Sequence, residues 1–145
     1  MRARDLMTPD PVTIAPQARI AEAWDLMREL EIRHIPVVAN GALVGMLSDR
    51  DLAHLDMTSV LTAAAPDVLR EELATPIAKV MHPDVIGVEP ETGLGEIVDL
   101  LLEHKVGALP VVAWDTYRVV GIVSYVDVLR VMRDRLVMRD RLDEA

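Results

Sequence analysis

The sequence contains one unit written twice, and this repeat limits the possible folds more than any other feature. Residues 7–39 align with residues 81–113 without a gap, and twelve of the thirty-three aligned pairs are identical. After a two-residue insertion in the next turn, GMLSDRD at 45–51 aligns with GIVSYVD at 121–127. A repeat of this length indicates two copies of one supersecondary unit, because each copy needs a neighbour to cover its apolar face.

Each copy shows the same alternation of strand-like and helical patterns. Apolar residues recur at helical spacing from Arg19 to Glu31 and from Leu94 to Leu102. Short apolar runs of strand type surround these helices, at residues 12–14, 35–38 and 43–47 and at residues 85–88, 109–112 and 119–123. Asn40-Gly41 predicts a two-residue hairpin turn, and Ser48 and Ser124 are expected to open the last helix of each copy. The predicted fold class is α+β, with two tandem β-α-β-β-α repeats packed sheet to sheet.

The repeat predicts four segments along the chain, and the two outside the repeats carry their own signals. The segments are repeat 1 at 1–56, a linker with a helical insert at 57–75, repeat 2 at 76–132, and a C-terminal helical extension at 133–145. Pro66 suits the first position of a helix PDVLREEL, and Thr75-Pro76 is typical of a cap followed by a first-turn proline. The insert has no counterpart in the second copy, so it is a connector or a lid, and we favour a connector.

The C-terminus repeats VMRDRL at 131–136 and 137–142. A six-residue repeat matches neither helical period, so it is no coiled-coil signature. We expect it to extend the last helix, with Asp and Arg pairing along a solvated face.

Composition excludes several classes of protein. The 145 residues are 51% hydrophobic and 27% charged, a balance that supports a buried core. A net charge of −9 without a Lys/Arg cluster argues against direct nucleic-acid binding. Cysteine is absent, so disulfides and a thiol nucleophile are excluded. The N-terminus lacks the apolar core of a signal peptide and no run approaches a membrane span, so we expect a cytoplasmic protein that does not enter a membrane.

The repeated Ser-x-x-Asp motif has two interpretations, and spacing alone does not separate them. It is close to a capping box, in which Ser and the acidic side chain satisfy the free N–H groups of a helix start. The same groups can also form a ligand site, since a helix N-terminus binds phosphate and a carboxylate accepts ribose hydroxyls.

Three motifs in order, present twice, resemble those of CBS domains, the regulatory modules named after cystathionine β-synthase. They are DLMTPDPVTI and AKVMHPDVIGV, IRHIPVV and VGALPVV, and GMLSDRD and GIVSYVD. The resemblance covers about residues 2–132 and implies a tandem CBS pair (Bateman module) with pseudo-two-fold symmetry. In this family the two clefts between the copies often bind AMP, ADP, ATP, S-adenosylmethionine or NAD-type molecules. The implied function is a homodimeric sensor that transmits its ligand state to a partner protein; a ligand-independent dimerisation module is the alternative.

The resemblance also implies which residues contact the ligand. Asp51 and Asp127 match the positions that bind ribose, and Ser48 and Ser124 match those near phosphate. The positions that pack on or near the base match Thr13, Ile32, Arg33, His34 and Met46 in the first copy, and Gly87, Val106, Gly107, Ala108 and Ile122 in the second. One cleft would combine Asp127, Ser124 and Ile122 with residues 32–34, and the other Asp51, Ser48 and Met46 with residues 106–108, where Arg50 or Lys105 supplies a cation.

No pattern predicts catalysis or a metal site. The four histidines lack the spacing of a metal-binding pair, and no Gly-x-Ser-x-Gly turn is present. Nothing supplies an activated nucleophile or a paired acid and base. We therefore expect no catalytic residue, no metal and no required cofactor, with an adenosyl molecule acting only as a regulatory ligand.

Overall fold

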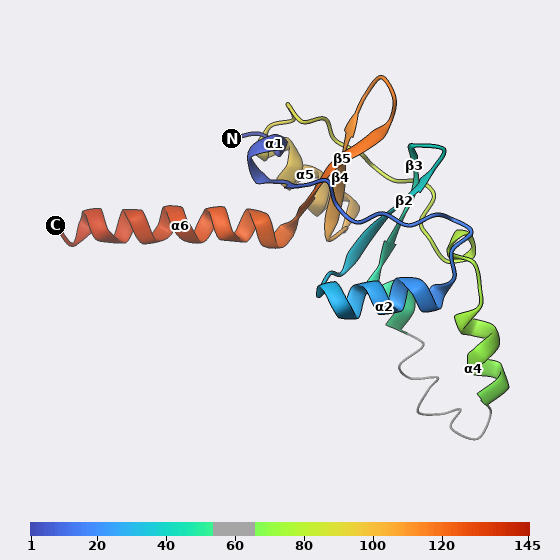
Figure 1. Cartoon of the computed structure of the whole chain (residues 1–145). Helices are drawn as coiled ribbons and strands as arrows, with labels where there is room; N and C mark the ends of the chain where they lie inside the picture. Colours follow the sequence, from blue (N-terminus) through green and yellow to red (C-terminus); the bar gives the residue numbers. More distant parts are fainter. Residues whose placement is uncertain (54–65) are drawn as a thin grey trace. The chain divides into compact units, whose positions relative to one another are not determined.

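The computed structural model of the protein describes residues 1–53 and 66–145 (Figure 1). The chain divides into two compact units: unit 1 comprises Met1–Asp10, Ile86–Asp115 and Val119–Ala145, and unit 2 comprises Pro11–Val85 and Thr116–Arg118. The end of the predicted repeat 1 and the first part of the predicted linker fall at 54–65, outside the described residues. That the insert is a connector and not a lid therefore stays a prediction.

Unit 2 is built around an antiparallel hairpin with helices beside it. Its elements are α2 (Ile20–Leu30), β2 (His34–Ala39), β3 (Ala42–Ser48), α4 (Pro66–Leu73) and the 3-10 helix η1 (Ile77–Lys79). Residues 49–53 are also helical. Asn40 and Gly41 both have positive φ, 52° and 79°, as a tight hairpin turn of this type requires. The predicted hairpin, the predicted α2 and the helix at PDVLREEL are confirmed.

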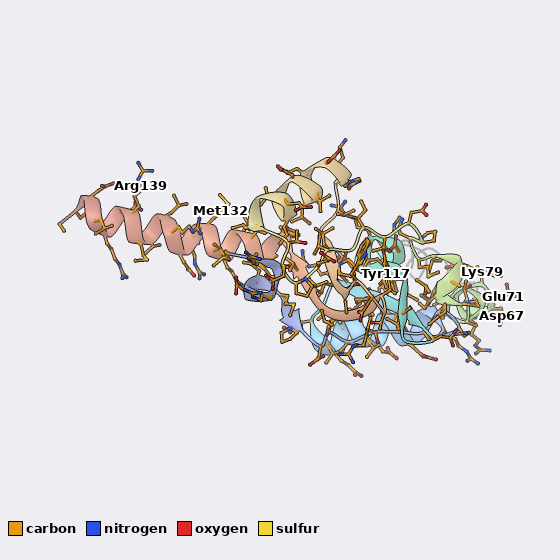
Figure 2. All side chains as sticks on the ribbon, turned by 90° about the horizontal axis from the view of Figure 1, so that it is seen from above. Asp67, Glu71, Lys79, Tyr117, Met132 and Arg139 are labelled. Atoms are coloured by element: carbon orange, nitrogen blue, oxygen red, sulfur yellow. The ribbon has the colours of Figure 1, made fainter. Side chains whose placement is uncertain are left out.

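Unit 1 repeats this plan with a third strand. Its elements are α1 (Ala3–Leu6), β1 (Thr8–Pro9), α5 (Leu94–His104), β4 (Ala108–Ala113), β5 (Arg118–Ser124, of which Arg118 is counted with unit 2) and α6 (Tyr125–Asp143). The strands lie in the order β1-β5-β4, with β1 antiparallel to β5. The VMRDRL repeat continues α6 as predicted, and its Arg and Asp side chains pair at the surface, for example Arg133 with Asp134 at 2.8 Å. Figure 2 shows Met132 and Arg139 along this helix, and Asp67 and Glu71 on α4.

The opening segment of each repeat pairs with the other repeat. In unit 1, Thr8 lies opposite Ile122 in an antiparallel pair. In unit 2, His82 lies opposite Met46, and their backbones exchange hydrogen bonds of 2.9 and 3.0 Å. These pairs occupy equivalent positions in the aligned copies, so the exchange is reciprocal. Each compact unit therefore takes its opening segment from the repeat whose remaining elements lie in the other unit.

The hydrophobic cores show the same exchange. The core of unit 2 consists of Ile14, Ile20, Ala23, Ile35, Val37, Leu47, Leu52 and Ile77, and that of unit 1 of Ala3, Val88, Ile97, Leu101, Leu109, Val111, Val123 and Val128. Ile77 and Ala3 come from the exchanged segments, and both side chains are fully buried. Burying an aliphatic side chain the size of isoleucine contributes about 1.5–3 kcal/mol, so the exchanged segments are part of what holds each unit together.

The glycine that begins each signature makes room for a methionine of the exchanged segment. A Cβ on Gly45 would lie 2.5 Å from the sulfur of Met81, and a Cβ on Gly121 would collide with Met7. Both contacts are closer than packed atoms approach, so a larger residue at either glycine would require the methionine or its segment to shift. The duplicated Gly and Met thus form one packing pair in each unit.

Two local predictions are wrong. The predicted opening strands at 12–14 and 85–88 are single bridges, at Ile14 and Val88, because flanking prolines lack the N–H groups that a ladder needs. The predicted cap at Thr75 fails as well. Pro76 is the N-cap of η1, and the Thr75 hydroxyl donates to the Glu71 carbonyl at 3.1 Å.

Candidate functional site

The two Ser-x-x-Asp motifs fold into closely matching helix caps. The Ser48 N–H donates to Asp51 Oδ2 at 2.8 Å, and the Ser48 hydroxyl donates to the same oxygen at 3.1 Å. Ser124 and Asp127 repeat both distances, and the Asp127 N–H donates in return to Ser124 Oγ at 3.4 Å. The capping interpretation is therefore confirmed, since these groups satisfy donors that a helix start leaves free.

Capping uses only one oxygen of each carboxylate, and the second oxygen has a different neighbour in each unit. Asp51 Oδ1 lies 2.9 Å from His82 Nε2. Asp127 Oδ1 lies 3.5 Å from Arg130 Nη1. The two carboxylate side chains are 12% and 16% exposed. A carboxylate fixed in this way offers one oriented acceptor oxygen to a hydroxyl or another donor.

The sequence patterns did not predict the contact between His82 and Asp51. The two residues are separated by 31 positions, and the spacing of the histidines bears only on metal binding. A signal was nevertheless present, because the repeat aligns His82 with Thr8 in the segment that opens each copy. Without knowledge of the exchange, that segment would be placed beside its own repeat and not beside Asp51.

The start of β2 lies against the first motif. The Asp49 N–H donates to the Arg33 carbonyl at 2.8 Å, and His34 lies opposite Ser48 in the hairpin register. Burial lowers the pKa of His34, with the charge of Asp49 opposing that shift and the charge of Arg33 adding to it. The Asp51 carboxylate also acts on His34 to raise its pKa. These predicted residues are therefore within electrostatic reach of one another inside unit 2.

The other predicted site residues of unit 2 lie at different places in the unit. Ile32 and Arg33 line an open hollow of about 630 Å³ between α2 and the helical residues 49–53, and the lining of this hollow includes neither Ser48 nor Asp51. Met46 is buried and paired with the exchanged segment. Thr13 and Arg50 are exposed.

Unit 1 brings its predicted residues together in the equivalent way. The Tyr125 N–H donates to the Gly107 carbonyl at 3.0 Å, which corresponds to the bond between Asp49 and Arg33. Ala108 begins β4 and is buried, Val106 is 40% exposed, and Ile122 pairs with β1. A Cβ on Gly87 would lie 3.1 Å from Val112, so this position packs against β4. Each predicted cleft combines residues of both units, and the assignment of the clefts stays a prediction.

Within residues 1–53 and 66–145, no group of three or more His, Asp or Glu residues is arranged to hold a metal ion. No helix in these same ranges combines the length and the apolar character that crossing a bilayer needs. His54, the second histidine of the sequence, lies outside the described residues.

Comparison with known proteins identifies the family. The model of the CBS domain matches residues 3–58 and 77–134. The chain is also 35% identical over 124 residues to the CBS domain-containing protein YhcV of Bacillus subtilis (strain 168), covering 86% of this chain and 80% of that protein. The chain belongs to the CBS domain family, as a tandem pair.

Solved structures agree with this assignment. The chain superposes on a protein provisionally linked to acetoin utilization, AcuB from Vibrio cholerae, with a TM-score of 0.74 and 34% identity, covering 97% of this chain and 96% of that one. It superposes on CBSX2, solved in complex with AMP, with a TM-score of 0.74 and 28% identity, covering 92% and 96%. The predicted α+β fold of two CBS repeats is confirmed.

Some relatives are much longer than this chain. It is 34% identical to the homoserine O-acetyltransferase of Methanocorpusculum labreanum and 29% identical to the inosine-5'-monophosphate dehydrogenase of Korarchaeum cryptofilum, but it spans only 23% of each. The likeness to these two enzymes is therefore confined to about a quarter of their length.

Proposed function

We propose that this protein is a regulatory sensor that binds an adenosine-containing ligand, either an adenine nucleotide (AMP, ADP or ATP) or S-adenosylmethionine. The ligand would occupy the clefts between the two CBS repeats. The observation that carries the proposal is the pair of Asp side chains, each held by a helix cap through one oxygen and presenting the other. The AMP complex of CBSX2, 28% identical over nearly its whole length, supports the choice of ligand class.

The chemistry of the motif suits a ribose with an attached phosphate. The oxygen of Asp51 or Asp127 that the cap does not use would accept from a sugar hydroxyl, in place of its contact with His82 or Arg130, and the helix N-terminus beside it favours a negative charge. The cap fixes the carboxylate before the ligand arrives, so little side-chain freedom is lost on binding. The serine hydroxyl, which donates to the carboxylate at 3.1 Å in each unit, can turn toward a phosphate instead.

The mechanism we propose is a population shift. A ligand that contacts both repeats favours one relative arrangement of them and thereby changes a surface that a partner protein recognises. The protein would act as a homodimer, and it would regulate its partner without catalysing a reaction.

A thermal-melting screen with AMP, ADP, ATP, S-adenosylmethionine and NAD tests this proposal. A true ligand at a hundredfold excess over its dissociation constant raises the free energy of unfolding by about 2.7 kcal/mol. In Asp127→Asn the amide oxygen keeps the cap acceptor and the anionic second oxygen is lost, so we expect the gain from the Asp127 cleft to be lost and only that from the Asp51 cleft to remain. Asp134→Asn, an exposed change on the same helix, is the matched control and should keep the full gain.

The alternative is a ligand-independent dimerisation module. The specific observation in its favour is the capping box at Ser124 and Asp127, which explains that motif without any ligand. The same screen separates the two functions. If none of the adenosine compounds shifts the melting temperature while dilution of the protein lowers it, the dimerisation module is correct and the sensor is not.

A further inference from the structure

We propose that Arg130 binds the phosphate of an adenine nucleotide at the Asp127 site, so that this site selects AMP, ADP or ATP over an adenosyl ligand without a phosphate. This inference rests on the proposed function and chooses within the ligand class that it names. Arg130 becomes a specificity-determining residue of the site, although neither the Ser-x-x-Asp spacing nor the family resemblance assigned it a role there.

Arg130 lies beside the carboxylate oxygen that the cap does not use. Its Nη1 is 3.5 Å from Asp127 Oδ1, whereas Asp127 Oδ2 accepts both bonds from Ser124. Side chains on a helix lean toward its N-terminus, so Arg130 reaches back from the second turn of α6 toward the first. A ribose whose hydroxyl donates to Asp127 Oδ1 would therefore lie next to the guanidinium group.

The ion pair between Arg130 and Asp127 is loose enough to be exchanged for a contact with a ligand. The Arg130 side chain is 65% exposed, and ion pairs of such exposed side chains contribute little to stability. A guanidinium group has five N–H donors, stays charged at physiological pH and binds phosphate oxygens in pairs. Arg130 can therefore give up the carboxylate oxygen to a sugar hydroxyl and donate to a phosphate on the same ribose.

The charges close to Arg130 in unit 1 favour an anionic ligand. From 122 to 131 the sequence contains one acidic residue, Asp127, and one basic residue, Arg130. The start of α6 adds a partial positive charge, which stabilises phosphate groups at helix N-termini. A phosphate there meets the guanidinium group and the helix start, and the acidic side chain of this stretch is the one that holds the ribose.

Charges from unit 2 are a separate contribution. The predicted cleft adds residues 32–34 to the Asp127 site, and the Asp49 N–H donates to the Arg33 carbonyl. Arg33, His34 and Asp49 therefore bring groups of both signs near the ligand. A test must compare proteins that all retain these residues and must use a single pH, so that their contribution is common and cancels.

The test measures the binding of AMP and adenosine by titration calorimetry at pH 8, where the phosphate of AMP carries about two negative charges. Asp51→Asn isolates the Asp127 site, and in this parent protein we expect AMP to bind about tenfold more tightly than adenosine. Arg130→Gln should weaken AMP binding about tenfold and change adenosine binding by less than about twofold, because only AMP loses a charge-assisted contact. Arg130→Lys keeps the charge but not the paired donors, so AMP binding should fall by less.

Arg133→Gln is the matched control, because Arg133 is an exposed arginine further along α6 that pairs with Asp134. It should keep the AMP preference of the parent. Circular dichroism melting checks that each variant is folded, and Arg130→Lys carries the comparison if Arg130→Gln is not.

The outcomes separate this inference from the proposed function. If Arg130→Gln weakens both ligands equally or neither of them, the inference is wrong and the sensor function stands. The same conclusion follows if the parent does not bind AMP although the wild type binds an adenosyl ligand. If the wild type binds none of AMP, ADP, ATP, adenosine and S-adenosylmethionine, the sensor function fails and the inference fails with it.

Discussion

Asp51 and Asp127 each combine two tasks in one side chain. One oxygen closes the cap and the other remains oriented at the helix start. A change that removes the whole carboxylate therefore disturbs stability and any ligand response together. Only a substitution that keeps the acceptor and removes the charge can separate the two effects.

The first residue-scale prediction uses this distinction on Asp127 in the absence of ligand. Asp127→Ala removes the acceptor of the Ser124 N–H and should lower the free energy of unfolding by about 1 kcal/mol. Asp127→Asn retains an oxygen at that place and should cost clearly less. Urea unfolding followed by circular dichroism measures both, and equal losses would mean that the cap is not what the carboxylate contributes.

The second residue-scale prediction concerns His34. Burial lowers its pKa below 6.5, so the unfolded chain binds this proton more readily than the folded one. The stability that follows from keeping His34 neutral is fully present above pH 6.5 and is lost as the pH falls through the lowered folded value. We expect His34→Gln to lose less stability than the wild type between about pH 7.5 and pH 5.5.

The exposed His104→Gln serves as the control for this measurement and should follow the wild type. Urea unfolding at the two pH values gives the comparison. An identical loss in wild type and His34→Gln would contradict the burial of a neutral imidazole.

At the scale of elements, hydrophobic periodicity and turn residues predicted the helices and turns that local sequence determines. The hairpin at Asn40-Gly41, the apolar stripe of α2 and the serine at the start of α6 each depend on residues close in the chain. α1 and β1 were missed because they contain four and two residues, too few to show a period. Their positions are set by packing against the other repeat, which no local pattern records.

In the candidate site too, local contacts could be predicted from the sequence and long-range contacts could not. The Ser-x-x-Asp motif was visible because its partners lie three positions apart. His82 was not, because its contact with Asp51 depends on the exchange of opening segments. The duplicated Gly and Met pack on each other in each unit, but because each copy carries both residues, the sequence does not tell which copy supplies the partner.

The element-scale prediction tests this packing. Gly121→Ala places a methyl group against Met7, including a contact of 3.0 Å to its Cβ, so the segment must move. We expect a loss of about 1–3 kcal/mol in unfolding free energy. Gly95→Ala, which has open space around the added Cβ on the exposed side of α5, is the control and should not destabilise.

Met7→Ala in the Gly121→Ala background should recover part of that loss, since the sulfur and the Cγ are removed. Denaturant unfolding of the wild type, the two single variants and the double variant gives the comparison. Additive losses in the double variant would show that the two residues do not meet.

At the scale of the whole molecule, a sequence repeat and a compact unit do not contain the same residues, because the opening segments are exchanged. A repeat taken alone carries an opening segment whose partner strand is missing, and it lacks the segment that its own core needs. Ile77, fully buried in unit 2, is the clearest case, because it belongs by sequence to the second repeat.

The whole-molecule prediction compares two fragments on this basis. A chain of residues 11–85 contains the complete core of unit 2, whereas residues 1–58 lack Ile77 and the segment around His82. We expect the first fragment to unfold cooperatively on heating and the second to show no cooperative transition, as followed by circular dichroism. A cooperative transition in the 1–58 fragment as well would show that the exchanged segment is dispensable.

A tilt of the last helix at the second Ser-x-x-Asp motif would be amplified along the length of that helix. α6 begins at the turn that contains Asp127 and runs for 19 residues to Asp143, with its outer part exposed to solvent (Figure 1). At 1.5 Å per residue this is a rod of about 28 Å. A tilt of about 10° at its first turn would carry the free end through about 5 Å, a displacement as large as the pitch of the helix itself.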